Sequence, residues 1–210
     1  MFDFPSWLYH GDVKLEDGTF FLSGFRKFGS IKTNTFKYKN FELRFKVNFE
    51  NELQDGVAVV DIDFDDPLTN WCSIVVAGED LALIIREDRC YKYSTPLDDI
   101  KMGQWNSFII NVEDSKISLS INESEAINFG ISKFNQVSIS FSNNSFNDRK
   151  NENIENAFKI QDICLIIDGK EIKAEKETIE LSKYRSDITN KDPIGSINTH
   201  GDIDRRFINI

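Results

Sequence analysis

The feature that most constrains this chain is a succession of short segments in which apolar and polar residues alternate. In residues 40–49, NFELRFKVNF, the apolar side chains would face one way, and Glu42, Arg44 and Lys46 would face the other. A period of two is typical of a β-strand with one buried face. Because a helix cannot gather such a pattern on one side, we predict a chain built from strands.

Similar strand-like runs follow one another at short intervals. They are residues 19–28, 40–49, 56–64, 71–78, 81–88, 107–114, 116–122, 136–142 and 158–168. Turn-forming pairs lie between several of them, including Asp17-Gly18, Asp114-Ser115 and Asp168-Gly169. Many short strands without long amphipathic helices predict an all-β, antiparallel, two-sheet jelly-roll sandwich.

Two segments depart from the strand pattern. Residues 143–156 are rich in asparagine and charge, which predicts a long surface loop. The stretch from Lys170 to Ser186 would form a short helix or a last strand. Residues 183–210 have no core periodicity but contain several isoleucines, so we predict an extended C-terminal tail after a sandwich domain of residues 1–182.

Composition and charge limit the classes of partner. The 210 residues carry a net charge of −10, and 40% of them are hydrophobic, so one domain with a sizeable core is expected. An acidic chain repels the phosphate backbone, which excludes nucleic acid as a favoured partner. No apolar run approaches the roughly 20 residues of a membrane-spanning helix, so membrane insertion is not expected. The first ten residues do not have the pattern of a secretory signal, which makes a cytoplasmic location the default expectation.

The three cysteines give little sign of a metal site or of a disulfide framework. Cys72, Cys90 and Cys164 are widely spaced, and the two histidines, His10 and His200, lie near the two ends of the chain. A structural zinc site needs about four such ligands close together. We therefore expect the cysteines to be small buried side chains within strands.

Three segments carry a resemblance to a known family: KYKNFELRFKV (37–47), GQWNSFIINVEDSKISLSIN (103–122) and AFKIQDICLIID (157–168). In this order they resemble strands of the concanavalin A-like lectin/glucanase superfamily, most closely its laminin-G-like jelly rolls, over about residues 11–168. Trp105 and the strand order carry most of the likeness, and Asn122-Glu123 stands where the pattern has Asn-Gly. The resemblance implies a jelly-roll domain that binds carbohydrate, cleaves it or holds an assembly together.

The stretch DGVAVVDIDFDDPLTNW, residues 55–71, places several carboxylates on one predicted strand. Asp61, Asp63 and Asp65 have the spacing of the Glu-x-Asp-x-Glu strand of the laminarinase-type members. Retaining glycosidases need carboxyl groups about 5–5.5 Å apart and inverting ones roughly 6.5–9.5 Å. Residues four apart on a regular strand are about 13 Å apart at Cα, and aspartate is shorter than glutamate. We therefore predict no catalytic residues here and rank a glycoside hydrolase third.

The same region offers a calcium site as an alternative. The oxygen ligands would come from Asp61, Asp63, Asp65, Asp66 and Asn70. Ca²⁺ takes 6–8 oxygen ligands, but the spacing does not complete an EF-hand, because Asp66 replaces the required glycine and Cys72 the required glutamate. A solvated strand face, which also discourages edge-to-edge pairing, is the simpler interpretation.

Exposed aromatic side chains would mark a sugar site, because flat sugar faces stack on them. Trp71, Tyr91 and Tyr93 are the candidates, with Asp63 as a partner for hydroxyl groups. Tyr91 and Tyr93 are two apart in a strand-like segment and would share one face. Core packing is the alternative for Trp71 and the expectation for Trp105.

Three functions therefore compete. The favoured interpretation is a non-catalytic, lectin-like carbohydrate-binding module. The runner-up is a structural or interaction domain of a larger assembly, in which residues 183–210 bind a protein partner as an arm. A glycoside hydrolase comes third, since the carboxylate spacing argues against it.

Overall fold

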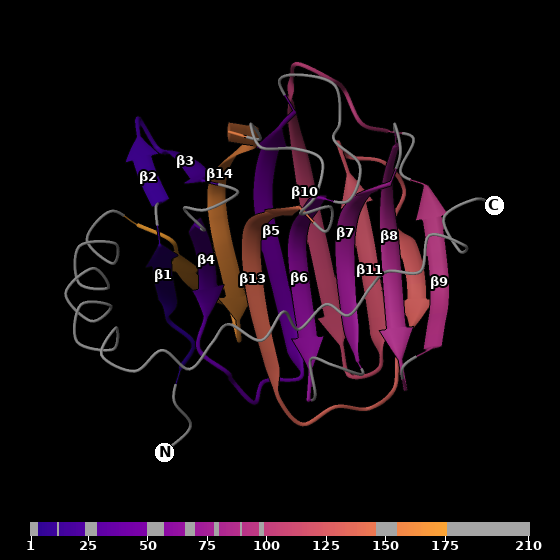
Figure 1. Cartoon of the computed structure of the whole chain (residues 1–210). Coiled ribbons are helices and arrows are strands. Elements are labelled where there is room, and N and C mark those ends of the chain that lie inside the picture. Colours follow the sequence, from indigo (N-terminus) through magenta and orange to yellow (C-terminus); the bar gives the residue numbers. More distant parts are fainter. Residues whose placement is uncertain are drawn as a thin grey trace.

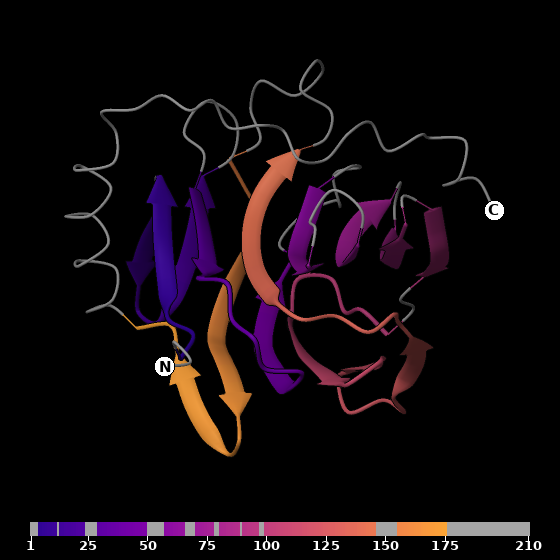
Figure 2. The ribbon, with the colours of Figure 1, turned by 90° about the horizontal axis from the view of Figure 1, so that it is seen from below.

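The computed structural model of the chain is a sandwich of two antiparallel β-sheets (Figure 1). It describes residues 4–11, 13–23, 29–49, 57–65, 70–77, 80–88, 90–96, 99–145 and 155–175. Seen from below, the two sheets form separate layers (Figure 2). The prediction of an all-β, two-sheet antiparallel sandwich is confirmed. Within the described ranges, no helix has the length and apolar character needed to cross a membrane.

One sheet has seven strands. Their order is β1 (Trp7–Gly11), β4 (Gly29–Thr33), β13 (Val137–Ser145), β6 (Val57–Phe64), β7 (Trp71–Ala77), β8 (Asp80–Glu87) and β9 (Cys90–Pro96). In the central strands of this sheet, residues that are paired across neighbouring strands lie on the same face. Ile62 of β6, for example, lies between Ile139 of β13 and Cys72 of β7, and all three side chains are buried in the core.

The other sheet has eight strands. Their order is β12 (Ile127–Gly130), β11 (Lys116–Ile121), β10 (Trp105–Glu113), β5 (Asn40–Asn48), β14 (Glu155–Ile167), β3 (Thr19–Ser23) and β2 (Val13–Glu16), and β15 (Lys170–Lys173) pairs with β14. In β5 the alternation seen in the sequence becomes alternating burial. Phe41, Leu43 and Phe45 face the core, whereas Arg44 and Lys46 are exposed on the outer face.

The hairpin turns follow from residues that accept a left-handed backbone. Asp17-Gly18 joins β2 to β3 and Asp168-Gly169 joins β14 to β15, each with positive φ at both positions. This is the geometry of a type I′ hairpin turn, for which Asp-Gly is a preferred pair. Glu123, which stands where the resemblance expects glycine, also has a positive φ of 67°.

Aromatic side chains join the two sheets at the centre of the core. Phe45 of β5 stacks on Phe108 of β10 with ring centroids 5.0 Å apart. Phe141 of β13 meets Phe45 edge-on at 5.0 Å and lies 6.1 Å from the ring of Trp7. Because β13 belongs to the seven-stranded sheet and β5 to the eight-stranded one, this cluster holds the layers face to face.

Several elements differ from the sequence prediction. The short strands β1, β2, β4 and β12 were not predicted. The predicted loop 143–156 begins within β13 and ends within β14, and its residues 146–154 lie outside the described part of the chain. Residues 170–173 form a strand, β15, whereas residues 176–186 of the same stretch lie outside the described part of the chain. The predicted tail, 183–210, lies outside the described residues.

Candidate functional site

The acidic strand is β6, and its carboxylates lie on the outer face of the seven-stranded sheet. Asp61 pairs with Ser73 and Asp63 pairs with Trp71, in a register in which the core side chains lie at the intervening positions. The interpretation of a solvated face is wrong for Asp61, which is only 4% exposed. Asp63 is half-buried and accepts a hydrogen bond from the Ser138 hydroxyl at 3.5 Å.

Asp65 lies just after the end of β6 and holds the chain near the start of β13. Its Oδ1 accepts the backbone N–H groups of Asn135 at 2.8 Å and Gln136 at 3.0 Å. The Gln136 side chain donates to the Asp65 carbonyl at 3.1 Å. With φ at 52°, Asp65 takes the left-handed backbone that aspartate tolerates in turns. These contacts give Asp65 a structural role in this loop.

The remaining members of the predicted calcium set do not come together with it. Asn70 uses its side-chain oxygen to accept the backbone N–H of Asp88 at 2.9 Å. Asp66 lies outside the described residues. Across the described ranges, no group of three or more His, Cys, Asp and Glu side chains is arranged to hold a metal ion. A calcium site that includes Asp66 stays a prediction.

The structure buries Trp71, a candidate for sugar stacking, and exposes Trp105, which was expected in the core. Trp71 is 3% exposed and packs with Ala58, Val75 and Ile84 in a small cluster, so it offers no open platform. Trp105 is 36% exposed at the start of β10, so the expectation that it packs in the core is wrong. The reason is the phase of the strand, since Asn106 takes the buried position and Trp105 the outer one.

The predicted tyrosine platform lies on β9. The backbone pairs Tyr93 with Ile85 and Tyr91 with Arg86, and a register shift lies between these two pairs. Ile85 belongs to the core, whereas Arg86 pairs with Trp71 on the outer face. The side chains of Tyr91 and Tyr93 lie outside the described part of the structure, so the platform stays a prediction.

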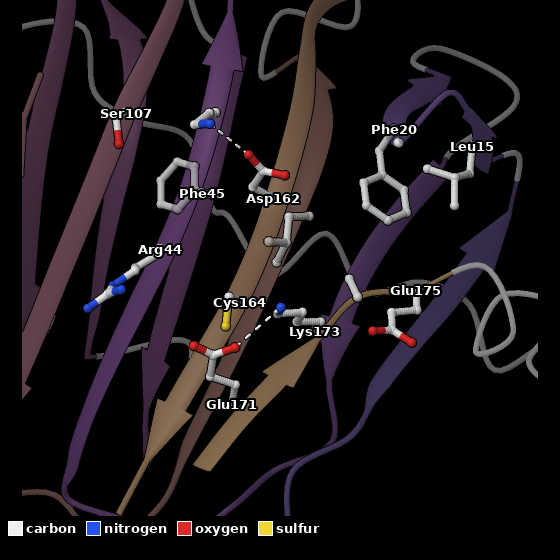
Figure 3. Close-up of a pocket in the computed structure, with 14 residues that line it drawn as sticks. Leu15, Phe20, Arg44, Phe45, Ser107, Asp162, Cys164, Glu171, Lys173 and Glu175 are labelled. Carbon is white, nitrogen blue, oxygen red and sulfur yellow. Dashed lines mark ion pairs between the residues drawn. The ribbon is translucent and has the colours of Figure 1, made fainter. Parts of the chain in front are cut away.

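A cavity of about 520 Å³ lies at the eight-stranded sheet, at the point where the neighbour of β14 changes from β3 to β15 (Figure 3). β14 pairs with β3 as far as Gln161 and with β15 from Cys164 onward. Between them the register against β5 shifts, and Asp162 has a positive φ of 54°. An extra residue of this kind is a β-bulge, which bends a strand and re-aims its side chains. The bulge therefore creates the opening beside β5.

Charged groups of both signs line this cavity. Lys46 pairs with Asp162 at 2.8 Å and Lys173 pairs with Glu171 at 3.3 Å, as the dashed lines of Figure 3 show. Arg44 lies beside them on β5, and it also pairs with Glu42 outside the cavity. The hydrogen bond and charge of Glu171 raise the pKa of Lys173, so this ammonium stays charged at neutral pH.

Apolar groups form the other side of the cavity. Leu15 and Phe20, from the β2–β3 hairpin, lie across from Asp162 and Glu171 in Figure 3. Cys164 lines the cavity as well, and burial raises the pKa of its thiol, which keeps it protonated at neutral pH. Of the other two cysteines, Cys72 is buried in the core, as predicted, and the side chain of Cys90 lies outside the described residues. A cavity with one apolar side and several polar groups is typical of a small-ligand site.

The sequence contained a signal for this cavity that the prediction did not use. In residues 158–168 the core positions are Phe158 and Ile160, and then Ile163 and Leu165. The period of two thus slips by one residue at Asp162. A polar residue at such a slip indicates a bulge, and bulges are frequent next to binding sites.

His10, on β1, gives the seven-stranded sheet a pH-sensitive group. Burial and the charge of Lys32 lower the pKa of His10 below its ordinary value of 6.5. The unfolded chain therefore binds the extra proton first, and the free energy of unfolding should fall as pH drops below about 6.5. We expect urea unfolding to show this loss between pH 7 and 5.5 in the natural chain and a smaller loss in His10→Asn. His200→Asn is the control, and an equal reduction in that variant would contradict the assignment to His10.

No protein-family model matches the chain, and no curated protein matches it in sequence. Solved structures do match. The receptor-binding domain of botulinum neurotoxin mosaic serotype C/D aligns with a TM-score of 0.55 and 15% identity, over 87% of this chain and 46% of that one. A structure of botulinum neurotoxin type C, whose cell entry depends on interaction with two ganglioside molecules, aligns with a TM-score of 0.55 and 14% identity over 88% and 47%.

A third match is the binding domain of botulinum neurotoxin DC in complex with SialylT, with a TM-score of 0.54 and 15% identity over 88% of this chain and 47% of that one. This chain thus spans about half the length of the proteins that it matches. At such low identity the likeness establishes the fold alone. That fold is a two-sheet, concanavalin A-like jelly roll, so the fold predicted from the resemblance is confirmed.

Proposed function

We propose that this concanavalin A-like sandwich is a non-catalytic carbohydrate-binding module whose sugar site is the cavity on the eight-stranded sheet together with Trp105. The observation that carries the proposal is the exposure of Trp105 two residues before Ser107, which lines the cavity. Residues two apart on a strand face the same side, about 7 Å apart. The indole ring therefore extends the cavity with a flat apolar surface on which a sugar ring can stack.

The polar groups of the cavity suit sugar hydroxyls, which both donate and accept hydrogen bonds. Arg44 and Lys46 supply donors, and Asp162 and Glu171 supply acceptors. The charged lining residues balance in sign, with cations at Arg44, Lys46 and Lys173 and carboxylates at Asp162, Glu171 and Glu175. This balance favours a neutral oligosaccharide over a strongly anionic one.

The comparisons support a sugar ligand without locating it. The matching neurotoxin structures include one concerned with gangliosides and one in complex with SialylT. We transfer to this chain the class of ligand and none of the residues. The proposal keeps the carbohydrate predicted from the sequence and moves its site from Trp71, which is buried, to the face that carries Trp105.

The test is a binding measurement with the Trp105→Ala variant. The probe is a printed array of neutral and sialylated oligosaccharides, followed by calorimetry with the strongest neutral binder. Loss of the stacking surface should weaken binding by about tenfold or more, which corresponds to ~1.4 kcal/mol. Lys46→Met should also weaken binding, because it removes a cavity donor.

Met102→Ala is the matched control. Met102 is another exposed large apolar side chain, it lies three residues before Trp105, and it does not line the cavity. Its removal should leave the affinity unchanged. Equal binding by the natural chain and Trp105→Ala, or no neutral or sialylated oligosaccharide bound by the natural chain, would refute the proposal.

A protein ligand is the second candidate function. The observation in its favour is that a further matching structure is a binding domain of botulinum neurotoxin DC in complex with rat synaptotagmin II, a protein; it aligns at 16% identity with a TM-score of 0.54. This candidate predicts that the array stays empty while a protein partner binds. The exposed pair of Trp105 and Ile109 on β10 would then be its first contact surface.

A further inference from the structure

The cavity of the eight-stranded sheet opens at a split in the strand pairing beside β14. On one side of the split β3 begins, and there the Gln161 side chain donates to the Thr19 hydroxyl at 2.8 Å. On the other side β15 has just ended, and there the Ala174 N–H donates to the Ile163 carbonyl at 3.1 Å. Asp162 is the residue of β14 between these two connections. The split therefore leaves an opening in the sheet at Asp162.

The lining of the cavity differs between its rim and its inner wall. The rim consists of the exposed charged side chains: Lys46, Asp162, Glu171 and Lys173. Between 45% and 63% of each of these side chains is open to solvent. The inner wall consists of apolar lining residues that are at most 2% exposed and belong to the core: Phe20, Phe45 and Ile163. A ligand that enters the opening therefore passes charged groups before it meets an apolar surface.

We propose that this opening binds the acetamido group of a terminal N-acetylhexosamine, with the methyl group against the inner wall and the amide at the rim; this ligand rests on the proposed function, because it is one sugar of the proposed oligosaccharide. The methyl group gains by leaving water for an apolar surface. An N-acetylhexosamine is also uncharged, which agrees with the balanced charges of the lining.

The amide of this group matches the charged pair at the rim. Its N–H can donate to the Asp162 carboxylate, and its carbonyl can accept from the Lys46 ammonium. These two groups are 2.8 Å apart, so an acceptor and a donor lie side by side at the opening. An ammonium has three donors and a carboxylate two oxygens, so each can bind the ligand without leaving its partner. An exposed ion pair is also weak enough to adjust to a ligand.

Other sugar substituents fit the opening less well. Gln161 and Ile163 are two residues apart on β14, about 7 Å at Cα. A gap of this width admits a narrow planar group more readily than a whole sugar ring. The methyl group of a deoxy sugar would reach the inner wall but offer no amide to the rim. A hydroxymethyl group would bring a hydroxyl against the apolar wall, which costs desolvation free energy.

Trp105 is too far from the opening to stack on the same sugar. Ser107 pairs with Lys46 across β10 and β5, and Lys46 pairs with Asp162 of β14. Trp105 is two residues before Ser107, so it lies two strand spacings and two residues from Asp162, roughly 12 Å. This is more than one sugar ring spans. The N-acetylhexosamine therefore occupies the opening, and a following sugar of the oligosaccharide stacks on Trp105.

The experiment compares oligosaccharides that differ in the acetamido group. One pair of probes is tri-N-acetylchitotriose and cellotriose, which share one backbone. The other pair is N-acetyllactosamine and its analogue with N-acetylgalactosamine in place of the terminal galactose. Calorimetry with the full chain should show that the acetylated member binds about tenfold tighter in at least one pair, because it adds a buried methyl group and two hydrogen bonds.

Two variants test whether this preference comes from the opening. Ala174→Leu puts a larger side chain at the half-buried cavity residue beside Ile163, and it should abolish the preference while the hydroxyl analogue binds as before. Asp162→Gly removes the acceptor, and glycine tolerates the positive φ of 54° at this position. It should also reduce the preference. Trp105→Ala should weaken both members of a pair alike, so the ratio of their affinities separates the two contacts.

Ala126→Leu is the matched control, because Ala126 is also half-buried but lies before β12, at the far edge of the sheet, and does not line the cavity. It should keep the preference. Equal affinity for both members of each pair, with a neutral oligosaccharide still bound, would leave the sugar site standing and overturn the acetamido assignment. A preference that survives in folded Ala174→Leu and Asp162→Gly would overturn it as well. A chain that binds no oligosaccharide would end both proposals.

Discussion

Replacing Phe141 with alanine should lower the free energy of unfolding by about 3–5 kcal/mol, as expected for a large aromatic removed from a packed core. Phe141 is fully buried and contacts Phe45 and Trp7. It comes from the seven-stranded sheet and Phe45 from the eight-stranded sheet, so the cavity would open between the layers. Urea unfolding followed by circular dichroism measures the loss.

Two further variants make this prediction specific. Phe141→Leu keeps much of the volume and should cost clearly less than the alanine change. Ile109→Ala removes an apolar side chain from the outer face of β10 and should stay within about 0.5 kcal/mol of the natural chain. If Phe141→Ala costs no more than Ile109→Ala, the core does not depend on this aromatic cluster.

The fold was predictable because its strands alternate and its turns use characteristic residues. The alternation in residues 40–49 became the alternating burial of β5. Asp17-Gly18 and Asp168-Gly169 became type I′ turns, because both positions need the left-handed backbone that these residues tolerate. The shorter strands β1, β4 and β12 were missed, because four or five residues hold too little alternation to be distinguished from a loop.

The candidate site was less predictable, because a period of two does not say which of its two faces is buried. Trp71 and Trp105 are each the first residue of a strand, yet Trp71 is buried and Trp105 is exposed. The cavity depends on the bulge at Asp162, where the period slips by one residue. It also depends on β15 replacing β3 beside β14, a pairing between segments far apart in sequence that local patterns do not encode.

The low exposure of the outer positions of β6, β7 and β8, such as Asp61, Trp71 and Ile84, had its own signal in the sequence. Runs such as Val57–Val60, Ile74–Ala77 and Leu81–Ile85 are nearly continuous apolar stretches. Strands with one solvated face alternate, whereas strands buried on both faces read as continuous runs. These runs belong to β6, β7 and β8, whose outer positions are buried, whereas residues 40–49 alternate and form β5, whose outer face is exposed. The continuous run before Asp61 therefore argues against a solvated acidic strand.

Replacing Asn106 with alanine should lower the free energy of unfolding by about 2–4 kcal/mol, because it leaves several buried polar groups without partners. Asn106 is 0% exposed on β10. Its Nδ2 donates to the carbonyls of Lys101 at 2.9 Å and Gln104 at 3.0 Å. Its Oδ1 accepts the Lys101 N–H at 2.7 Å and the Asn122 side-chain amide at 2.9 Å. Asn106 thus ties the segment before β10 to the turn after β11.

Asn128→Ala is the matched control for this change. Asn128 is an exposed amide on the same sheet, and its side chain donates to the Ala126 carbonyl two residues away at 3.0 Å. The free energy of unfolding should change by no more than about 0.5 kcal/mol in that variant. Hydrogen exchange supplies a second measurement, since loss of Asn106 should speed exchange at Lys101 and Ser107, whose N–H groups are held by Asn106 and Asn122. Equal stability of Asn106→Ala and Asn128→Ala would show that water replaces the lost bonds at no cost, and the anchoring role of Asn106 would have to be abandoned.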